Sequence, residues 1–594
     1  MSINFNKLSQ LKSVLCAEDY ECVVDFASKL HWVQLPKNTY LFHQGEEGNS
    51  FYIVVSGLLQ VVLESKLGSK PLQQISSGEY IGEFAMFTDQ PRSAGIVALR
   101  ESYLIKFPKE IFTDVITQHP KVSKKIICEI INRVQKKNQA THKKCQIFAI
   151  IPLENSMDIS SFVEKLQQNL KKFGKCSHID EQKACDLMEI KRQKGRIPDS
   201  IVLSKSLEKQ ETKNNFLLYE ANPQYDFWTK KCIEHCDQVI LIAPAKSHTK
   251  LRDIEKKLQR ENKAVHALIL MYENNEKPNK TIDWLNKRSV KIHHHCRWNN
   301  QKHFEKLARF FSGNTIGLVL GGGGVRGLAH LGVIKALNEA QIPIDIIGGT
   351  SAGGLCAISH GIGMDPDQIL EHNRAGFLEQ KIFQEYDIPF ISLIRGRKYT
   401  KAVQVMFRNL HLEDLWTQTF TVSCNLTTGK EHIHREGVCW KAGLASGAVP
   451  GILPPIVEKN EILVDGGIIN NLPSNILKEI FQSNVILVSV SKEDYWNLHF
   501  SQKPPSLWQI ISNFFRKKKR TYPNILDLLM RSALVNSINQ EREAVENADV
   551  FLQPPVTEYG MLEFEKMHEV VKVSYQYTQQ QISDIRKQLA HCRI

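Results

Sequence analysis

Two glycine-rich turns within residues 315–353 constrain the fold of this chain more than any other stretch. Residues 321–327 read Gly-Gly-Gly-Gly-Val-Arg-Gly and follow an apolar run, and residues 349–353 read Gly-Thr-Ser-Ala-Gly and follow another. Between the turns, apolar residues recur at helical spacing, at Val325, Leu328, Leu331, Ile334 and Leu337. The order strand, turn, helix, strand, turn predicts a βαβ unit with both turns at the same edge of one sheet.

Each turn has a chemical interpretation. G-x-S-x-G after a strand is the nucleophile elbow, whose glycines allow a tight turn that presents a serine hydroxyl, here that of Ser351, at the start of a helix. A glycine run at a helix N-terminus exposes backbone N–H groups, which suits a developing oxyanion. Residues 322–327 also satisfy G-x-G-x-x-G, the dinucleotide fingerprint, with Asp345 near the position of its ribose-binding acid. An NAD(P)-linked oxidoreductase is therefore the competing hypothesis, although a dinucleotide fold has no need of the second turn.

A serine nucleophile needs a base, and the sequence offers an acid for that role. Asp465 ends the apolar run of residues 462–464 and enters a Gly-Gly turn. None of the histidines after Ser351 lies in a glycine-flanked loop that obviously ends a strand. A carboxylate delivered in this way can act on Ser351 directly, as a Ser–Asp dyad.

The first 140 residues have a different texture. Short β-like runs alternate with glycine turns from about residue 31, which predicts a small β-roll. Residues 82–86, Gly-Glu-Phe-Ala-Met, and residues 91–94, Pro-Arg-Ser-Ala, together resemble the phosphate-binding cassette of cyclic-nucleotide-binding domains. The resemblance implies that Arg92 holds the cyclic phosphate of cAMP or cGMP and that Glu83 accepts a hydrogen bond from the ribose. It assigns the shaping of the pocket to Gly82, Ala85 and Ser93. The alternative is a β-roll that keeps the fold and binds nothing.

Residues 141–312 alternate short apolar strands with helices, which predicts a parallel, Rossmann-like α/β domain. This stretch has no phosphate-loop glycine motif, so we assign it no catalysis. Two groups within it contain metal-ligand types, namely Cys232, His235 and Cys236, and the run His-His-His-Cys at residues 293–296. Neither has a second ligand pair at a typical spacing, so we predict no metal site.

Charge and composition indicate an anionic partner in a reducing compartment. Lys and Arg number 76 against 63 Asp and Glu, a formal charge of +13. This balance favours a membrane surface or nucleic acid. The 13 cysteines lack framework spacing, and we find neither a signal peptide nor a transmembrane run, so we expect a cytoplasmic protein. The apolar and aromatic residues 507–515 followed by the basic residues 516–520 predict peripheral membrane attachment through residues 507–520. We do not expect a nucleic acid partner. Small apolar residues at 442–455 suggest either an acyl channel or tight helix packing.

The glycine run, the Gly-Thr-Ser-Ala-Gly turn and Asp465-Gly-Gly together resemble the motif set of patatin-like phospholipases in order, spacing and strand context. Residues 281–286, 312–314, 453–455 and 470–473 extend the resemblance to the neuropathy target esterase branch, which joins cyclic-nucleotide-binding domains to a patatin domain. The resemblance implies a nucleophile, Ser351, and a base, Asp465. It implies an oxyanion hole made by the amides of Gly322, Gly323 and Gly324 with electrostatic support from Arg326. The implied activity is hydrolysis of phospholipid or lysophospholipid esters without a catalytic cofactor, regulated by cyclic nucleotide.

The predicted chain is thus a multidomain α/β protein. Residues 1–140 form a cyclic-nucleotide-binding β-roll with flanking helices, and residues 141–312 form the Rossmann-like domain. Residues 313–500 form a patatin-like α/β hydrolase domain, and residues 501–594 form its mainly helical C-terminal extension. Three hypotheses stand at this point: a serine lipid esterase with a nucleotide sensor, an NAD(P)-linked oxidoreductase, and a non-catalytic nucleotide-binding scaffold.

Overall fold

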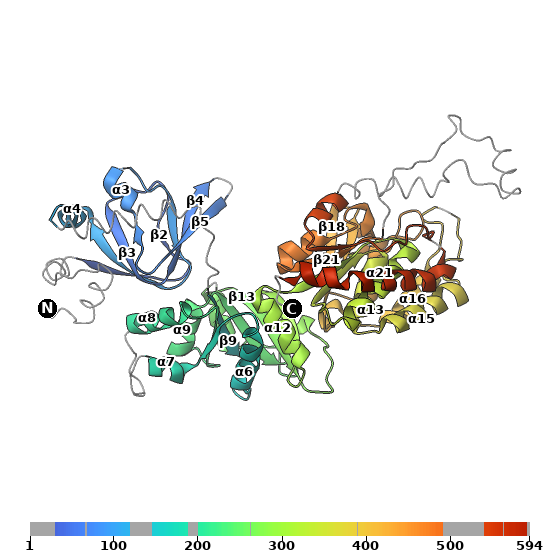
Figure 1. The fold of residues 1–594 in the computed structure, drawn as a ribbon, viewed down its shortest axis with the longest axis horizontal. Helices are drawn as coiled ribbons and strands as arrows, with labels where there is room; N and C mark the ends of the chain where they lie inside the picture. The colour runs from blue at the N-terminus through green and yellow to red at the C-terminus, as the bar shows by residue number, and fades with distance from the viewer. Residues whose placement is uncertain are drawn as a thin grey trace, which may run out of the picture. The chain divides into compact units, whose positions relative to one another are not determined.

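The computed structural model describes residues 30–65, 68–88, 90–118, 145–187, 200–261, 263–388, 390–490, 540–561 and 563–590. The chain divides into two compact units, residues 1–271 with 288–298 and residues 272–287 with 299–594 (Figure 1). The membrane-contact segment predicted at residues 507–520 lies outside the described residues. None of the helices in the described ranges combines the length and the apolar character that crossing a membrane requires.

The N-terminal part of the first unit is a β-roll of two four-stranded sheets, drawn in blue in Figure 1, with strand orders β1-β8-β3-β6 and β2-β7-β4-β5. The strands are β1 (His31–Leu35), β2 (Tyr40–Phe42), β3 (Ser50–Ser56), β4 (Leu58–Ser65), β5 (Gly68–Ser76), β6 (Tyr80–Ile81), β7 (Gly95–Ala98) and β8 (Ser102–Pro108). Alternate apolar residues such as Val54, Leu59 and Leu104 are fully buried in its core. Two helices, α3 (Glu83–Thr88) and α4 (Lys109–Gln118), follow β6 and β8.

The second part of this unit is a six-stranded sheet of order β10-β11-β9-β12-β13-β14. Its strands are β9 (Gln146–Pro152), β10 (Cys176–Ile179), β11 (Phe216–Glu220), β12 (Gln238–Pro244), β13 (Val265–Tyr272) and β14 (Val290–Arg297). Its helices are α6 (Ile159–Leu170), α7 (Glu181–Leu187), α8 (Ser200–Glu211), α9 (Phe227–His235) and α10 (Asp253–Arg260). Neighbouring strands from β10 through β13 are parallel. The chain builds the sheet outward from β9 on one side and from β12 on the other, which is the doubly wound pattern.

The second unit is built on a sheet of order β19-β20-β17-β16-β15-β21-β22, with β18 paired to β17. Its strands are β15 (Ile316–Leu320), β16 (Ile346–Thr350), β17 (Gln418–Asn425), β18 (Lys430–His434), β19 (Ile456–Glu458), β20 (Glu461–Asp465), β21 (Asn484–Val488) and β22 (Val550–Leu552). Strands β17, β16, β15, β21 and β22 are parallel, whereas β18 and β20 run antiparallel to β17. The parallel strands β15 and β16 are fully buried, as expected for strands covered on both faces.

The helical elements of this unit lie before, between and after its strands. They are α11 (Ile282–Leu285), α12 (Gln301–Ser312), η2 (Gly324–Leu328), α13 (Ala329–Glu339), α14 (Ala352–Ile362), α15 (Pro366–Arg374), η3 (Ala375–Glu379), α16 (Arg397–Phe407), η4 (Leu412–Asp414), α17 (Cys439–Ser446), η5 (Gly466–Ile468), α18 (Ser474–Ile476), η6 (Leu477–Phe481), η7 (Phe564–Lys566) and α21 (Met567–Gln588). The long C-terminal α21, red in Figure 1, packs against α13, where Ser574 Oγ donates to the carbonyl of Ala329 at 2.7 Å. A Cβ on Gly332 would lie 2.1 Å from Ser574 Oγ, so glycine permits this close approach.

The predicted fold class is confirmed: a β-roll, a doubly wound α/β part and a C-terminal α/β part are all present. The C-terminal stretch contributes more than helices, because β22 pairs with β21 at the edge of the second unit's sheet. The predicted domain boundaries stay predictions.

Candidate active site

Ser351 lies in a strained turn between β16 and α14. Its φ of 57° and ψ of −124° are an unusual conformation for a residue with a side chain, and such strain is concentrated at functional sites. The glycines on either side allow the turn, since a Cβ on Gly349 or Gly353 would lie 2.4 or 2.2 Å from the carbonyl oxygen of Leu320. The turn therefore has the geometry of a nucleophile elbow.

Asp465 meets this serine from the end of β20. Ser351 Oγ donates a hydrogen bond to Asp465 Oδ2 at 2.7 Å, and the other carboxylate oxygen accepts the N–H of Gly467 at 2.8 Å. The carboxylate is buried, and burial raises the pKa of Asp465 to about 6 although both hydrogen bonds oppose the rise. A carboxylate with this pKa is ionised at neutral pH and is a stronger base than an exposed aspartate.

A second serine holds the elbow in place. The N–H of Ser351 donates to Ser446 Oγ at 2.9 Å, and Ser446 Oγ donates to the carbonyl of Val422 at 2.7 Å. The N–H of Asp465 donates to the carbonyl of Ala448 at 2.9 Å, just beyond α17. The end of α17 therefore positions both members of the dyad. Sequence reasoning did not single out Ser446, because its partner lies 95 residues away in the chain.

The glycine run lies against the nucleophile. A Cβ on Gly322 would be 3.0 Å from Ser351 Cβ. The N–H of Gly322 donates to Asn471 Oδ1 at 3.0 Å, and Asn471 Nδ2 donates to Glu541 Oε1 at 2.8 Å. The N–H groups of Gly323 and Gly324 have no hydrogen-bond partner among the described residues. Of the three amides predicted to form the oxyanion hole, one is thus occupied by Asn471.

The C-terminal segment anchors this run from its other side. Arg326 Nε donates to the carbonyl of Tyr559 at 2.6 Å, and the N–H of Val325 donates to the carbonyl of Met561 at 2.9 Å. Gly324 has a φ of 60°, and a Cβ there would lie 2.5 Å from the Met561 carbonyl oxygen. Burial lowers the pKa of Arg326. The guanidinium thus fastens the C-terminal segment, and its electrostatic effect on an oxyanion stays a prediction.

The histidines near these elements have other partners. His330 Nε2 lies 2.7 Å from the carbonyl oxygen of Gly321, and burial lowers its pKa to about 4. His434 Nε2 lies 2.8 Å from Ser423 Oγ, and burial lowers its pKa to about 3. Both imidazoles are therefore neutral at physiological pH. The base that the described residues bring to Ser351 Oγ is the carboxylate of Asp465.

Asp345 is not placed to bind a ribose. It precedes β16 and lies at the amino edge of the sheet, whereas the glycine run follows the carboxyl end of β15. Its carboxylate is bound by Arg309, with Nη2–Oδ1 at 2.7 Å and Nε–Oδ2 at 2.9 Å, and it accepts the N–H of Ile316 at 3.1 Å. These contacts make Asp345 a buried structural residue, and they remove the acid on which the dinucleotide hypothesis depended.

The stretch of small residues at 442–455 packs closely in the structure. Ala442, Ala445 and Ala448 are buried. A Cβ on Gly443 would lie 2.9 Å from Leu355 Cδ2. The small side chains therefore let α17 approach α14, which favours the packing interpretation over an acyl channel.

In the β-roll, the residues assigned to the nucleotide gather around α3. Arg92 Nη2 donates to the carbonyl of Ser50 at 2.7 Å and Nη1 to that of Gly82 at 3.3 Å, and the guanidinium stacks 4.1 Å from the ring centroid of Phe42. Arg92 Nε is buried without a partner among the described residues. Glu83 opens α3 and is 3% exposed.

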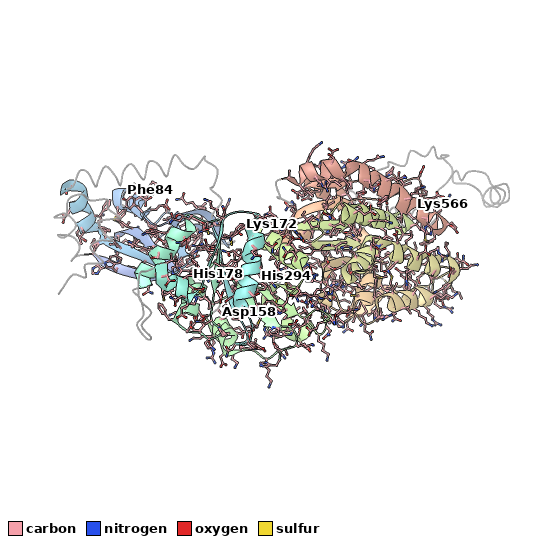
Figure 2. All side chains as sticks on the ribbon, turned by 60° about the horizontal axis from the view of Figure 1, so that its bottom comes forward. Phe84, Asp158, Lys172, His178, His294 and Lys566 are labelled. Atoms are coloured by element: carbon pink, nitrogen blue, oxygen red, sulfur yellow. The ribbon has the colours of Figure 1, made fainter. Side chains whose placement is uncertain are left out.

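The other members of the set lie close by. Ala85 is buried within α3, where a Cβ on Gly48 would touch it, and Ser93 is exposed next to Arg92. Phe84, labelled in Figure 2, is 53% exposed on α3. One guanidinium with an unsatisfied N–H and one buried carboxylate fit a cyclic phosphate and a ribose hydroxyl in chemistry. A bound phosphate would have to draw Arg92 away from its two carbonyl partners.

Neither candidate metal group assembles among the described residues, which contain no cluster of three or more His, Cys, Asp or Glu able to hold a metal ion. His235 Nε2 lies 3.0 Å from Ser204 Oγ, and burial raises the pKa of the Cys232 and Cys236 thiols. His294, labelled in Figure 2, is buried on β14, while the rings of His293 and His295 pack edge-on.

Three protein families match successive parts of the chain. Residues 32–119 match the cyclic nucleotide-binding domain, residues 144–315 match the Neuropathy Target Esterase family P-loop like domain, and residues 318–478 match the patatin-like phospholipase family. The last match contains both Ser351 and Asp465.

Several proteins are similar to this chain over most of its length. Neuropathy target esterase sws of Drosophila melanogaster is 27% identical over 92% of this chain and 42% of its own length. Patatin-like phospholipase domain-containing protein 6 of Pongo abelii is 28% identical over 93% of this chain and 44% of its own. Lysophospholipase NTE1 of Pyricularia oryzae is 26% identical over 93% and 42%. The chain thus spans less than half the length of these relatives. A solved cyclic nucleotide-binding domain from Methylobacillus flagellatus is 17% identical, with a TM-score of 0.21, over 22% of this chain and 80% of that one.

Proposed function

Because the chain carries the domain set of the neuropathy target esterase branch of patatin-like phospholipases, we propose that it hydrolyses carboxylic esters of phospholipids or lysophospholipids through Ser351 and Asp465. The observation that carries this proposal is the 2.7 Å hydrogen bond from Ser351 Oγ to Asp465 Oδ2. An elbow serine joined to a buried carboxylate is the pair of nucleophile and base that acyl transfer requires.

The reaction proceeds in two steps through an acyl-enzyme. Asp465 accepts the proton of Ser351 as Oγ attacks the ester carbonyl carbon, and the carbonyl electron pair moves onto oxygen. When the carbonyl re-forms, the alcohol product leaves with the proton from Asp465. Water then attacks the acyl group on Ser351 with Asp465 again as base, and the fatty acid is released. Each step uses only protein groups and water, so the proposed reaction needs no catalytic cofactor.

The amides of Gly323 and Gly324 supply the oxyanion contacts in this proposal. One such donor is worth about 3–4 kcal/mol of transition-state stabilisation. Gly322 contributes a third donor only when its hydrogen bond to Asn471 breaks. Arg326 lies two residues beyond Gly324, and in this proposal its positive charge stabilises the oxyanion while its Nε is bound to the carbonyl of Tyr559.

The β-roll is proposed to bind a cyclic nucleotide, cAMP or cGMP, with Arg92 on the phosphate and Glu83 on the ribose hydroxyl. The unsatisfied Nε of Arg92 supports this assignment. Gly82, Ala85 and Ser93 complete the pocket. Replacing Arg92 with glutamine removes the charge and should abolish binding of a fluorescent cyclic nucleotide, while Arg435→Gln, a substitution in the other unit, should leave it unchanged. Equal binding by both variants would refute the assignment.

We further propose that the protein is cytoplasmic and attaches to membranes peripherally through residues 507–520. The apolar and aromatic run followed by five basic residues supports this placement. This proposed attachment does not involve a membrane-spanning helix among the described residues.

Hydrolysis of a lysophosphatidylcholine panel, with and without cAMP, tests the proposed activity. We expect fatty-acid release that is lost in Ser351→Ala and retained in Ser359→Ala. Ser359 is the matched control because it lies in α14, the helix that follows Ser351, and its hydroxyl donates to the Leu355 carbonyl. Hydrolysis that survives Ser351→Ala would contradict the nucleophile. An absence of hydrolysis under both conditions would favour the non-catalytic scaffold.

A further inference from the structure

The segment that precedes α16 exposes large apolar side chains in close succession. Tyr386, Ile388, Phe390 and Ile391 are 75%, 70%, 90% and 72% exposed. Single exposed apolar residues are ordinary on protein surfaces, whereas several together mark a binding surface. We call residues 385–388 and 390–395 the apolar hairpin. Its two arms run antiparallel, Tyr386 lies on the first arm, and Ile388, Phe390 and Ile391 lie between the arms at the tip.

The arms of the hairpin are fastened to each other. Tyr386 and Ile394 form an antiparallel bridge, the N–H of Asp387 donates to the carbonyl of Leu393 at 3.0 Å, and the N–H of Arg395 donates to that of Glu385 at 2.8 Å. Arg395 Nε also pairs with Asp387 Oδ2 at 2.9 Å. The exposure of the tip is therefore a property of a formed structure.

The base of the hairpin is tied to the wall of the catalytic dyad. The N–H groups of Leu393 and Ile394 donate to the carbonyls of Gly451 and Ile452 at 2.8 and 3.0 Å. Three residues before Gly451, the carbonyl of Ala448 accepts the N–H of Asp465. The same segment, residues 448–452, therefore bonds to both the base of the hairpin and Asp465.

The residues beyond each arm of the hairpin point inward to the same core. Tyr399 on α16 is buried, and its pKa is raised by burial and by the charge of Asp465. Its ring lies 5.3 Å from that of Phe383, which precedes the hairpin, and Phe383 lies 5.2 Å from Phe377. The hairpin therefore has an inner base near the dyad and an outer tip whose apolar side chains are exposed.

Exposed cationic side chains flank the apolar hairpin in the chain. Lys381 lies before the hairpin, and Arg397, Lys398 and Lys401 lie in the first turns of α16. All four are exposed, and none makes an ion pair with a described residue. Of the two acids in the hairpin, Asp387 pairs with Arg395, and Glu385 accepts the N–H of Lys398 at 3.1 Å, so the cations outnumber the acids. An apolar tip with a basic collar matches the surface of an anionic bilayer, where apolar side chains enter the acyl boundary and cations meet the headgroups.

We propose that the apolar hairpin docks on an anionic phospholipid surface, with Phe390 and Ile391 inserted and the basic side chains of α16 on the headgroups. This site is distinct from residues 507–520. The proposal rests on the proposed function, because hydrolysis of phospholipid esters is the reason for the protein to meet a lipid surface. A second copy of the chain is a poorer occupant, because a two-fold contact would bring the two basic collars together.

Sedimentation of the full chain with vesicles tests the docking. Vesicles of phosphatidylcholine with one third phosphatidylserine are compared with vesicles of phosphatidylcholine alone. We expect Phe390→Ser/Ile391→Ser to weaken binding to the anionic vesicles about tenfold or more, since binding scales with the apolar area inserted. Leu63→Ser/Leu72→Ser is the matched control, since these side chains are 41% and 55% exposed on the β-roll, and it should bind as the wild type does.

A second variant keeps the proposal open to refutation if the serine variant folds poorly. Arg397→Gln/Lys401→Gln should weaken binding to anionic vesicles and leave the weaker binding to phosphatidylcholine unchanged. Wild-type binding to anionic vesicles by both hairpin variants would overturn the proposal. So would a change in oligomeric state on ultracentrifugation, caused by the hairpin substitutions without a change in lipid binding.

The same variants separate docking from catalysis. Hydrolysis of a water-soluble short-chain ester should stay within about twofold of the wild type in Phe390→Ser/Ile391→Ser, because the dyad is untouched. Vesicle binding by a wild type that hydrolyses no ester would refute the proposed function and leave the docking intact. Ester hydrolysis by a wild type that does not bind vesicles would refute the docking and leave the proposed function intact.

Discussion

The buried carboxylate of Asp465 makes a quantitative prediction for the pH dependence of catalysis. Only the ionised form accepts the proton of Ser351, and burial raises the pKa of Asp465 to about 6. The ionised fraction is about 0.9 at pH 7 and about 0.1 at pH 5, so kcat/KM should fall about tenfold between these values. An exposed aspartate, with a pKa near 4, would leave the rate almost unchanged over this interval.

Lysophosphatidylcholine suits this measurement, because the charges of its headgroup do not change between pH 5 and 8. We expect log kcat/KM to rise with pH with a slope of one below the pKa and to level off above about pH 7. Melting curves at each pH exclude unfolding as the cause. A profile that is flat down to pH 5, or the same inflection in Asp465→Asn, would refute the assignment of Asp465 as the base.

Three further substitutions test how the site is built. Burial makes ionisation of Asp465 unfavourable in the folded state, so this carboxylate destabilises the fold at pH values above its raised pKa, whereas below about pH 4 it is protonated in both the folded and the unfolded state. Asp465→Asn should therefore stabilise the protein at pH 7 by up to about 3 kcal/mol, measured by chemical denaturation. The absence of a pH-dependent gain in stability would contradict the burial argument. Asn471→Ala removes the contact that holds the glycine run in place, and the resulting displacement of the Gly323 and Gly324 donors should lower kcat about 10–100-fold with a small change in KM. An unchanged or raised kcat would show that this contact does not position the oxyanion hole. Gly353→Ala places a Cβ against the Leu320 carbonyl and should lower stability by about 1–3 kcal/mol together with activity; a fully active, equally stable variant would contradict the steric argument.

Local sequence patterns predicted much of the fold and identified Ser351 and Asp465 as the central pair of the site. The glycines around Ser351 are required by the close passage of the Leu320 carbonyl, so the elbow appears in the sequence as spacing. Asp465 appears in the same way, as an acid that ends an apolar strand. The order of the three structured parts also followed from local texture, because a β-roll and a doubly wound sheet differ in period and in strand spacing.

Contacts between distant segments could not be predicted in this way. Ser446 and Asn471 are ordinary polar residues in the sequence, and their roles come from partners 95 and 149 residues away. Nothing local indicates that β22 joins the sheet beside β21. Likewise, no local pattern singles out Tyr386, Ile388, Phe390 and Ile391, whose exposure is seen only in the structure.

The most direct test of the account is the site of covalent labelling by a fluorophosphonate, which reacts with an activated serine hydroxyl. Peptide mass spectrometry of the labelled full chain should place the adduct on Ser351. Labelling should disappear in Ser351→Ala and slow strongly in Asp465→Asn, because the base that activates the hydroxyl is gone. An adduct on another residue, or undiminished labelling of Ser351→Ala, would contradict the Ser351–Asp465 dyad.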